Sequence, residues 1–312
     1  MHYEPSTNDK KFNIAISDVT CQYSPMSELA EINRTRITLL RLIFMQFFAD
    51  RLAYGYDLNV DLARGLSGRL LTNANTQTSD SLPFSEYPED CAAIYLNKDS
   101  SHTKPSQSGV YEIWPRQGKP IKVLCDMDID GGGWTVFQKR GDWKPQESFY
   151  RTWLEYKRGF GDLQRQFWLG NDRLSILTNQ DSYQLRVDLE DFDGQKRFAE
   201  YNSIRISNEA DKYRLILGSY VTGDAGDSLS NHNNMQFSTK DQDNDPSTGS
   251  CAQLYNGAWW YKECHSSNLN GEYLRGNHPT IYAAGVNWLS FRGYNYSLKS
   301  TEMKIRPTWY KP

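Results

Sequence analysis

The stretch that decides the fold of this chain is Phe237-Ser-Thr-Lys-Asp-Gln-Asp-Asn-Asp245, which continues as Pro-Ser-Thr-Gly. It places three carboxylates, Asp241, Asp243 and Asp245, at alternate positions of a turn-forming segment. Alternate positions in a turn let several oxygen atoms face one point, and Ca²⁺ takes about six to eight oxygen ligands, including backbone carbonyls. The stretch therefore predicts a calcium site.

This acidic loop begins like an EF-hand but does not continue as one. Its sixth position is Pro246, where an EF-hand requires Gly, and its twelfth is Ala252, where a bidentate Glu is required. An EF-hand is therefore excluded. An isolated acidic turn is more often a solvated loop than a metal site. Cys251 lies two residues after Gly249, however, and a disulfide there would make the loop rigid enough to hold an ion.

The spacing of the five cysteines excludes a zinc site, because no close second pair of Cys or His ligands is present. Four of them lie from position 91 onward, and an even set indicates two disulfides, with three connectivities open. The pairing that closes the shortest loops is Cys91–Cys125 with Cys251–Cys264. Disulfides indicate an oxidising compartment. The fifth cysteine, Cys21, is then either free or available to link subunits.

The composition favours a loop-rich extracellular binding domain. Aromatic residues make up 13% of the 312 residues, beside abundant Asn, Asp and Gly. With a net charge of −3 and no block of Lys or Arg, the chain is not expected to bind nucleic acid or a membrane surface. It has no G-x-S-x-G, H-E-x-x-H or P-loop motif, so we expect no enzymatic activity.

Residues 1–80 form an N-terminal extension that ends in a Thr- and Asn-rich linker. Its apolar run, residues 37–49, is interrupted by Arg41 and Gln46, so it is too short and too polar to span a membrane. The start of the chain does not resemble a signal peptide. We interpret the run either as a displaced signal segment or as an interaction helix.

From about residue 82 the pattern changes to short strands separated by turn clusters. Short helices are expected at 153–160 and 172–178. After residue 221 the regularity fades into a long Asn-, Asp- and Gly-rich region. Strands are expected at 109–114, 121–125, 134–138, 183–189, 196–207, 213–220 and 302–307.

Several long motifs resemble those of fibrinogen-related domains. The motifs are GGGWTVFQ at 131–138, the acidic run at 237–245, GAWWYKECHSSNLNG at 257–271, GYNYS at 293–297 and EMKIRP at 302–307. They occur in the order and spacing of that family, and the resemblance covers residues 82–310. Within the family, the sequence looks most similar to the ficolins and the horseshoe-crab tachylectins.

The resemblance implies an α+β fold of three fused parts. These are an N-terminal piece held by the first disulfide, a central and mainly antiparallel sheet with short helices, and a loop-rich C-terminal part that holds calcium and ligand. It also implies the local disulfide pairing and a cis peptide bond between Glu263 and Cys264.

The same resemblance implies the residues of two sites. The calcium ligands would be the side chains of Asp243 and Asp245 with the carbonyls of Ser247 and Gly249, and Asp241 would lie nearby as an outer partner. A hollow walled by tyrosines would take the methyl of an acetyl group, and backbone donors would bind its carbonyl oxygen. Taken singly, each tyrosine is more simply explained by core packing, but the matched set favours a pocket. The implied pocket residues are Tyr255, Cys264, His265, Tyr282, Ala283 and Tyr294.

We therefore predict a secreted, calcium-dependent lectin that binds N-acetylated sugars or other acetylated ligands on cell or microbial surfaces, in innate recognition. Because one shallow pocket binds weakly, we also expect a homo-oligomer. The alternative is a protein-binding module of the clotting, matrix or signalling type. Clotting chains carry an acid near the second-loop cysteine, where this chain has Leu254-Tyr-Asn256, which favours the lectin. The turn Ala283-Ala-Gly285 departs from the Asn-Gly turn of relatives and puts the position of Tyr282 in doubt.

Overall fold

The structure is a computed structural model, and it describes residues 87–96 and 107–311. The interpretations of residues 1–80, including the apolar run and Cys21, lie outside the described residues and stay predictions. So does the boundary between the extension and the domain.

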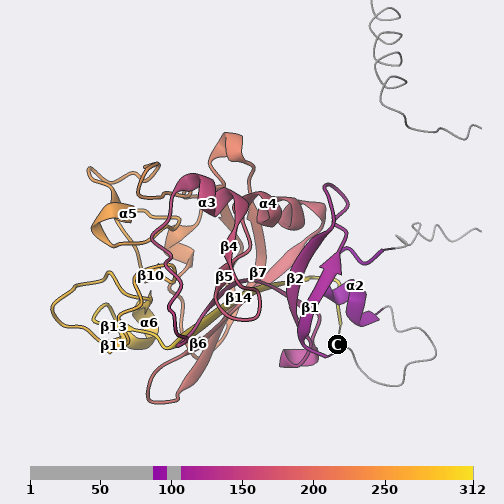
Figure 1. Cartoon of the computed structure of the whole chain (residues 1–312), viewed down its shortest axis with the longest axis horizontal. Helices are drawn as coiled ribbons and strands as arrows, with labels where there is room; N and C mark the ends of the chain where they lie inside the picture. The colour runs from indigo at the N-terminus through magenta and orange to yellow at the C-terminus, as the bar shows by residue number, and fades with distance from the viewer. Residues whose placement is uncertain (1–86, 97–106, 312) are drawn as a thin grey trace, which may run out of the picture. The chain divides into compact units, whose positions relative to one another are not determined.

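A large antiparallel sheet forms the centre of the described part of the chain (Figure 1). Its strands follow the order β1-β2-β3-β14-β6-β7-β8, while β4 pairs with β5, β5 with β3, and β9 with β7. The last strand, β14, lies between β3 and β6, so the end of the chain runs through the middle of the sheet. The bounds are β1 Gly109–Ile113, β2 Ile121–Asp126, β3 Trp134–Arg140, β4 Phe160–Gly161, β5 Phe167–Trp168, β6 Tyr183–Glu190, β7 Lys196–Ile206, β8 Leu215–Leu217, β9 Tyr220–Thr222 and β14 Ser300–Pro307.

The two faces of the sheet differ in character, as the alternation in β6 shows. Leu185 and Val187 are buried against the core, while Arg186 and Asp188 lie on the opposite face, where charged side chains from neighbouring strands surround them. This is the period of two that the sequence of the strand predicts. The charged face holds the ammonium of Lys304, which is almost fully buried.

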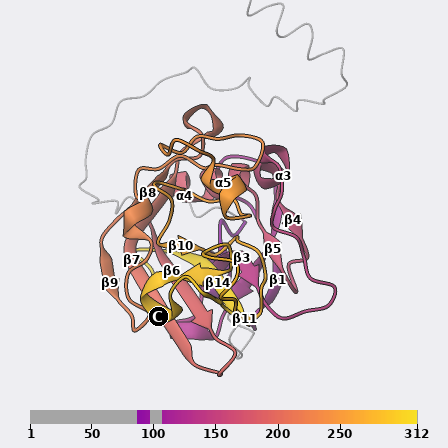
Figure 2. The same cartoon turned by 90° about the vertical axis from the view of Figure 1, so that its left-hand side faces the viewer.

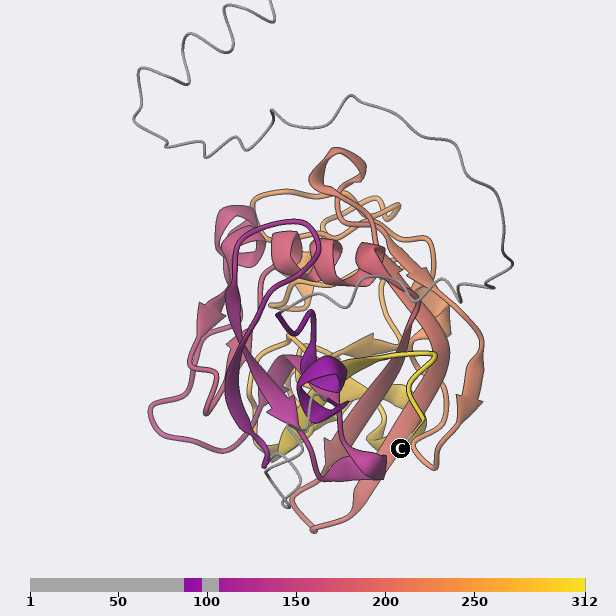
Figure 3. The same ribbon diagram turned by 90° about the vertical axis from the view of Figure 1, so that its right-hand side faces the viewer.

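Helices cover the apolar face. They are α2 Cys91–Leu96, α3 Trp153–Arg158 and α4 Asn171–Gln180, and Figure 1 shows α3 and α4 side by side over the strands. At the start of α3 the Thr152 amide donates to Glu155 Oε2 at 2.8 Å, the reciprocal bond of a capping box. The amide of Trp153 donates to Asp241 Oδ1 at 2.9 Å, so the acidic loop also caps this helix. Figure 3 shows the end of the molecule that carries α2.

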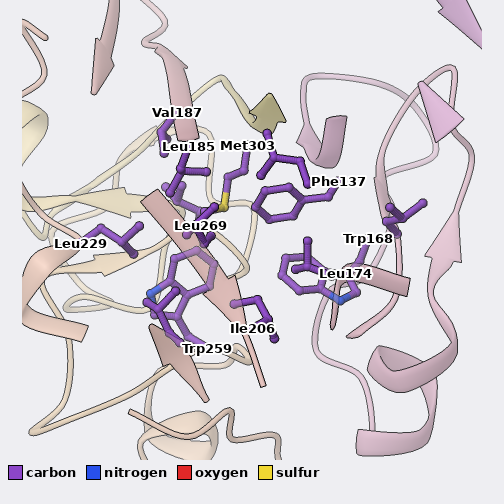
Figure 4. Packing of buried hydrophobic residues seen from close by; sticks show 14 of the residues in the cluster. Phe137, Trp168, Leu174, Leu185, Val187, Ile206, Leu229, Trp259, Leu269 and Met303 are labelled. Atoms are coloured by element: carbon purple, nitrogen blue, oxygen red, sulfur yellow. The ribbon is translucent and has the colours of Figure 1, made fainter. Parts of the chain in front are cut away.

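A single buried cluster joins the sheet to the rest of the domain. Phe137 of β3, Trp168 of β5 and Met303 of β14 belong to it, and so do Trp259 and Leu269 from the C-terminal part (Figure 4). The rings of Phe137 and Trp168 meet edge to face with centroids 5.8 Å apart. The parts of the described domain therefore share one core.

Residues 223–299, which we call the loop-rich region, contain short elements at the end of the molecule that Figure 2 faces. Disulfides Cys91–Cys125 and Cys251–Cys264 are present, with the pairing expected from the resemblance. The α+β fold with a central antiparallel sheet, short helices and a loop-rich C-terminal part is thus confirmed. The elements are η3 Ser230–His232, α5 Cys251–Leu254, β10 Ser267–Asn268, β11 Gly276–Asn277, β12 Asn287–Trp288, α6 Leu289–Arg292 and β13 Tyr296–Ser297.

Two buried polar side chains of β3 fasten the loop-rich region to the sheet. Gln138 Nε2 donates to the carbonyl of Leu269 at 3.1 Å, and Arg140 Nη1 donates to the carbonyls of Leu269 and Gly271 at 3.0 and 2.9 Å. Carbonyls of an irregular segment need such donors when they are buried.

Within the described ranges, no helix is long and apolar enough to cross a membrane.

Candidate functional site

The loop-rich region is organised around His265, which is 7% exposed. The residue follows Cys264 of the second disulfide, and the Glu263–Cys264 peptide bond is cis, as the resemblance implied. Nε2 of His265 donates to the carbonyl of Ala283 at 3.0 Å. Burial lowers the pKa of His265 to about 3, so the imidazole is neutral at physiological pH.

Tyrosine rings surround this imidazole. The Tyr255 ring lies edge-on to His265 at 4.7 Å between centroids, and the Tyr294 ring does so at 5.7 Å. Tyr282 stands next to Tyr294, at 5.4 Å. The Tyr294 hydroxyl donates to the carbonyl of His265 at 2.9 Å. The structure therefore brings together the residues predicted for the pocket, which we call the His265 site: Tyr255, Cys264, His265, Tyr282, Ala283 and Tyr294.

The turn that departs from the family pattern keeps Tyr282 at the site. Ala283 has φ = 59°, a left-handed conformation that costs a residue with a side chain about 1–2 kcal/mol. Its amide donates to the carbonyl of Tyr294 at 3.2 Å, which together with the His265 bond holds the turn. Ala284 is buried, and its carbonyl accepts from the Glu272 amide at 2.9 Å.

Apolar side chains stand exposed on the segments that build the site. Tyr282 is 60% exposed and Ile281 is 41% exposed, on the turn that also carries Ala283. Leu254, beside Tyr255, is 66% exposed. Exposed aromatic and aliphatic groups that adjoin one another, as Ile281 and Tyr282 do, are typical of sites that bind another molecule.

An acidic side chain that the sequence analysis did not single out lies next to the tyrosine wall. Asn256, the residue after Tyr255, donates from Nδ2 to Glu272 Oε2 at 3.1 Å. Both line a cavity of about 440 Å³. Its other lining residues are Arg140, Gln146, Glu147, Ser148, Phe149, Tyr150, Gly271 and Tyr273. Asn256 and Glu272 are 16 positions apart in sequence, so no local pattern could have indicated that their side chains meet.

The acidic loop has the geometry of an oxygen-donor site. The Asp245 amide donates to Asp243 Oδ1 at 3.2 Å, and Asp245 itself accepts from the amides of Ser247 and Cys251, each at 3.1 Å. Burial and the neighbouring Asp243 carboxylate raise the pKa of Asp245 to about 6. Two carboxylates held this close in one loop repel each other when both are ionised, and a cation between them would remove that repulsion.

The donor set of this loop fits calcium. Among the described residues, no hydrogen bond uses the carbonyl oxygens of Ser247 and Gly249, which the resemblance names as ligands beside Asp243 and Asp245. Carboxylates and free carbonyls are the donors that Ca²⁺ prefers. Asp241 caps α3 instead of turning toward this pair. Over residues 87–96 and 107–311, no group of three or more His, Cys, Asp or Glu side chains is placed to hold a metal ion.

Residues 44–308 match the family of fibrinogen beta and gamma chains, C-terminal globular domain. The chain belongs to this family. As a fibrinogen-like protein it is similar to the fibrinogen-like globe domain of human ANGPTL2, with 44% identity over 71% of this chain and 99% of that one, and a TM-score of 0.65.

The chain is also similar to two further solved structures. The globe domain of human ANGPTL6 is 42% identical over 72% of this chain and 96% of that one, with a TM-score of 0.65. Lamprey fibrin D-dimer, solved with the peptide ligand Gly-His-Arg-Pro-amide, is 31% identical over 92% of this chain and 89% of that one, with a TM-score of 0.66. The membership predicted from the motifs is confirmed, and a special closeness to ficolins or tachylectins stays a prediction.

Proposed function

We propose that this fibrinogen-like chain is an extracellular binding protein that recognises a protein partner through the His265 site and the adjoining cavity. The observation that carries the proposal is the position of Glu272, whose carboxylate lies beside Asn256 at the edge of the tyrosine wall. A peptide segment with a cationic group could pair with Glu272 while its apolar part packs on Tyr282 and Ile281.

The comparisons support a peptide-recognition role. Lamprey fibrin D-dimer, which this chain resembles, was solved with a bound peptide. The domain has disulfides, as extracellular proteins do, and we propose that it acts outside the cell. We propose binding and not catalysis as its role, and self-association as the means by which weak single sites reach useful avidity.

We propose that Asp243 and Asp245, with the carbonyls of Ser247 and Gly249, hold a structural calcium ion. When bound, the ion supplies charge neutralisation and fixes the loop. The amide of Cys251, the first residue of α5, donates to Asp245 Oδ2, and Cys251 forms the disulfide with Cys264. A fixed loop therefore also steadies the segment that carries His265.

A second candidate function is calcium-dependent recognition of N-acetylated sugars. The observation in its favour is the neutral imidazole flanked by Tyr255 and Tyr294, with Tyr282 packed on Tyr294, a setting suited to an uncharged acetyl group. This candidate leaves Glu272 and the exposed Ile281 without a role, which is why the protein-binding function ranks first.

Binding of the purified, labelled full chain to cell surfaces separates the two functions. In one arm the cells are treated with trypsin, and in another the assay contains N-acetylglucosamine. Protein recognition predicts that trypsin abolishes binding while the sugar leaves it unchanged. Acetyl-sugar recognition predicts competition by the sugar and release by chelator, and that result would overturn the first function.

A further inference from the structure

Outside the His265 site, one buried histidine holds the segment that carries it. His232, at the end of η3, is fully buried. Its Nδ1 bonds to the carbonyl of Trp260 at 2.7 Å, and its Nε2 bonds to the amides of Ser266 and Ser267 at 3.1 and 3.2 Å. These bonds fasten both ends of the segment 260–267, which contains His265.

The partners of His232 fix its tautomer. A carbonyl oxygen can only accept, so Nδ1 carries the hydrogen and donates to Trp260; amides can only donate, so Nε2 must keep its lone pair for Ser266 and Ser267. The ring is therefore required as a neutral imidazole that donates on one side and accepts on the other. Burial lowers the pKa of His232 to about 4, which agrees with that requirement.

We propose that His232 is the positioning residue of the binding site, holding segment 260–267 in the shape that presents His265 to the tyrosine wall. The inference rests on the proposed function of the His265 site. His232 itself lies in the interior, where it contacts the backbone of the segment. A residue that merely filled the core would act through its volume, whereas His232 acts through three directed hydrogen bonds.

Two carboxamide variants, His232→Gln and His232→Asn, separate a positioning role from core filling. Each keeps the hydrogen bonding of one ring nitrogen and loses that of the other. In His232→Gln the amide reaches the Nε2 position and can still accept from Ser266 and Ser267. In His232→Asn the amide reaches the Nδ1 position and can still donate to Trp260, but the acceptor is lost. Leu177→Ala, a buried position in α4, serves as the control for general destabilisation.

The first readout is amide hydrogen exchange, followed by mass spectrometry on the full chain with calcium present. We expect exchange in residues 264–268 to be roughly tenfold faster in His232→Asn, as for the loss of about one net hydrogen bond, with β6 unchanged. In His232→Gln, exchange in residues 264–268 should stay near the wild-type rate. In Leu177→Ala, exchange should be faster across the domain and not in residues 264–268 specifically. Equal behaviour of the Gln and Asn variants, or unchanged exchange in His232→Asn, overturns the proposal.

A measurement on the wild type covers the case in which the variants do not fold. In histidine-selective ¹⁵N spectra, His232 should show the Nδ1–H tautomer and should not titrate between pH 8 and about 5.5. The other tautomer, or titration near the ordinary value, overturns the proposal. Neither readout needs a partner, so they fail independently of the proposed function. If both succeed and cell binding also falls in His232→Asn, the link to the site is established.

Discussion

The imidazole of His265 meets the ring of Tyr255 edge-on, with centroids 4.7 Å apart and ring planes at 88°. The contact joins α5, which follows the acidic loop, to the segment after the second disulfide. Tyr294 packs against the same imidazole from a third stretch of chain. The site thus depends on the acidic loop, the disulfide and the buried hydrogen bonds that hold these stretches together, and each dependence can be tested.

Calcium should stabilise the domain through the acidic loop. At a concentration of about 100 times its Kd, binding to the folded state adds about 3 kcal/mol to the free energy of unfolding. Thermal unfolding with calcium and with chelator should therefore differ, and Asp245→Asn should remove the difference. Asp241→Asn keeps the oxygen that caps α3 and should respond to calcium as the wild type does. A calcium response that survives Asp245→Asn would exclude this loop.

Acid should destabilise the domain through its buried neutral histidines. The pKa of His232 falls from an ordinary 6.5 to about 4 on folding, so between these values the unfolded state binds more protons. The stability that the neutral ring contributes is complete above pH 6.5 and is lost progressively as the pH falls from 6.5 to about 4. At about pH 4 the loss reaches about 3 kcal/mol. Urea unfolding at a series of pH values measures this loss. His232→Gln should show a smaller one, and an equal loss would assign the effect to other groups.

The second disulfide should stabilise the region around the His265 site in particular. Cys251 and Cys264 are separated by 13 positions, and closing a loop of that size contributes about 3 kcal/mol. Replacing both with Ser should lower the free energy of unfolding by about this amount. Hydrogen exchange should rise first around residues 251–268, with β3 still protected. Uniform loss of protection would mean that the disulfide supports the whole domain instead.

The charged face of the sheet should be sensitive to one substitution. Lys304 Nζ, with its side chain 2% exposed, lies 2.6 to 2.9 Å from carboxylate oxygens of Asp126, Asp188 and Glu302. Burial opposes its charge, yet these carboxylates raise the pKa of Lys304.

Lys304→Met should cost about 3–5 kcal/mol, because it removes the counter-ion of the largely buried Asp126. It also leaves Asp188 and Glu302 with one cation each, Arg186 and Lys139. Lys299→Met, which breaks an exposed pair with Glu190, is the matched control and should unfold like the wild type. Equal effects in chemical denaturation would show that the cluster around Lys304 is solvated.

The sequence was sufficient where structure depends on local pattern. The alternation in β6 and the short helices α3 and α4 follow from side-chain periodicity, and the expected strand at 302–307 exists within β14. Its insertion between β3 and β6 could not be predicted, because pairing between distant strands leaves no local signal. The strand expected at 213–220 is interrupted: β8 ends at Leu217, and β9 begins at Tyr220.

The interruption has a physical reason at Gly218. A Cβ there would lie 2.0 Å from Asn202 Oδ1 and 3.0 Å from the amide nitrogen of Ser203, so a residue with a side chain would have to displace Asn202 of β7. Of the predicted pocket residues, Cys264, His265 and Tyr294 lie within the long motifs, whereas Tyr255, Tyr282 and Ala283 come from the wider resemblance. A ligand-binding role for all six stays a prediction. Glu272 and His232 were missed because their roles come from contacts across 16 and 28–35 positions in sequence, respectively.

The central claim is that the surface around His265, with Glu272, binds the partner. The most direct measurement is cell-surface binding of the full chain carrying Tyr282→Ala or Glu272→Gln, beside Trp309→Ala, which removes another half-exposed aromatic side chain. The account predicts a loss of about tenfold or more for the first two, with wild-type thermal stability, and no change for Trp309→Ala. Wild-type binding by both Tyr282→Ala and Glu272→Gln would contradict the account and place the binding surface elsewhere.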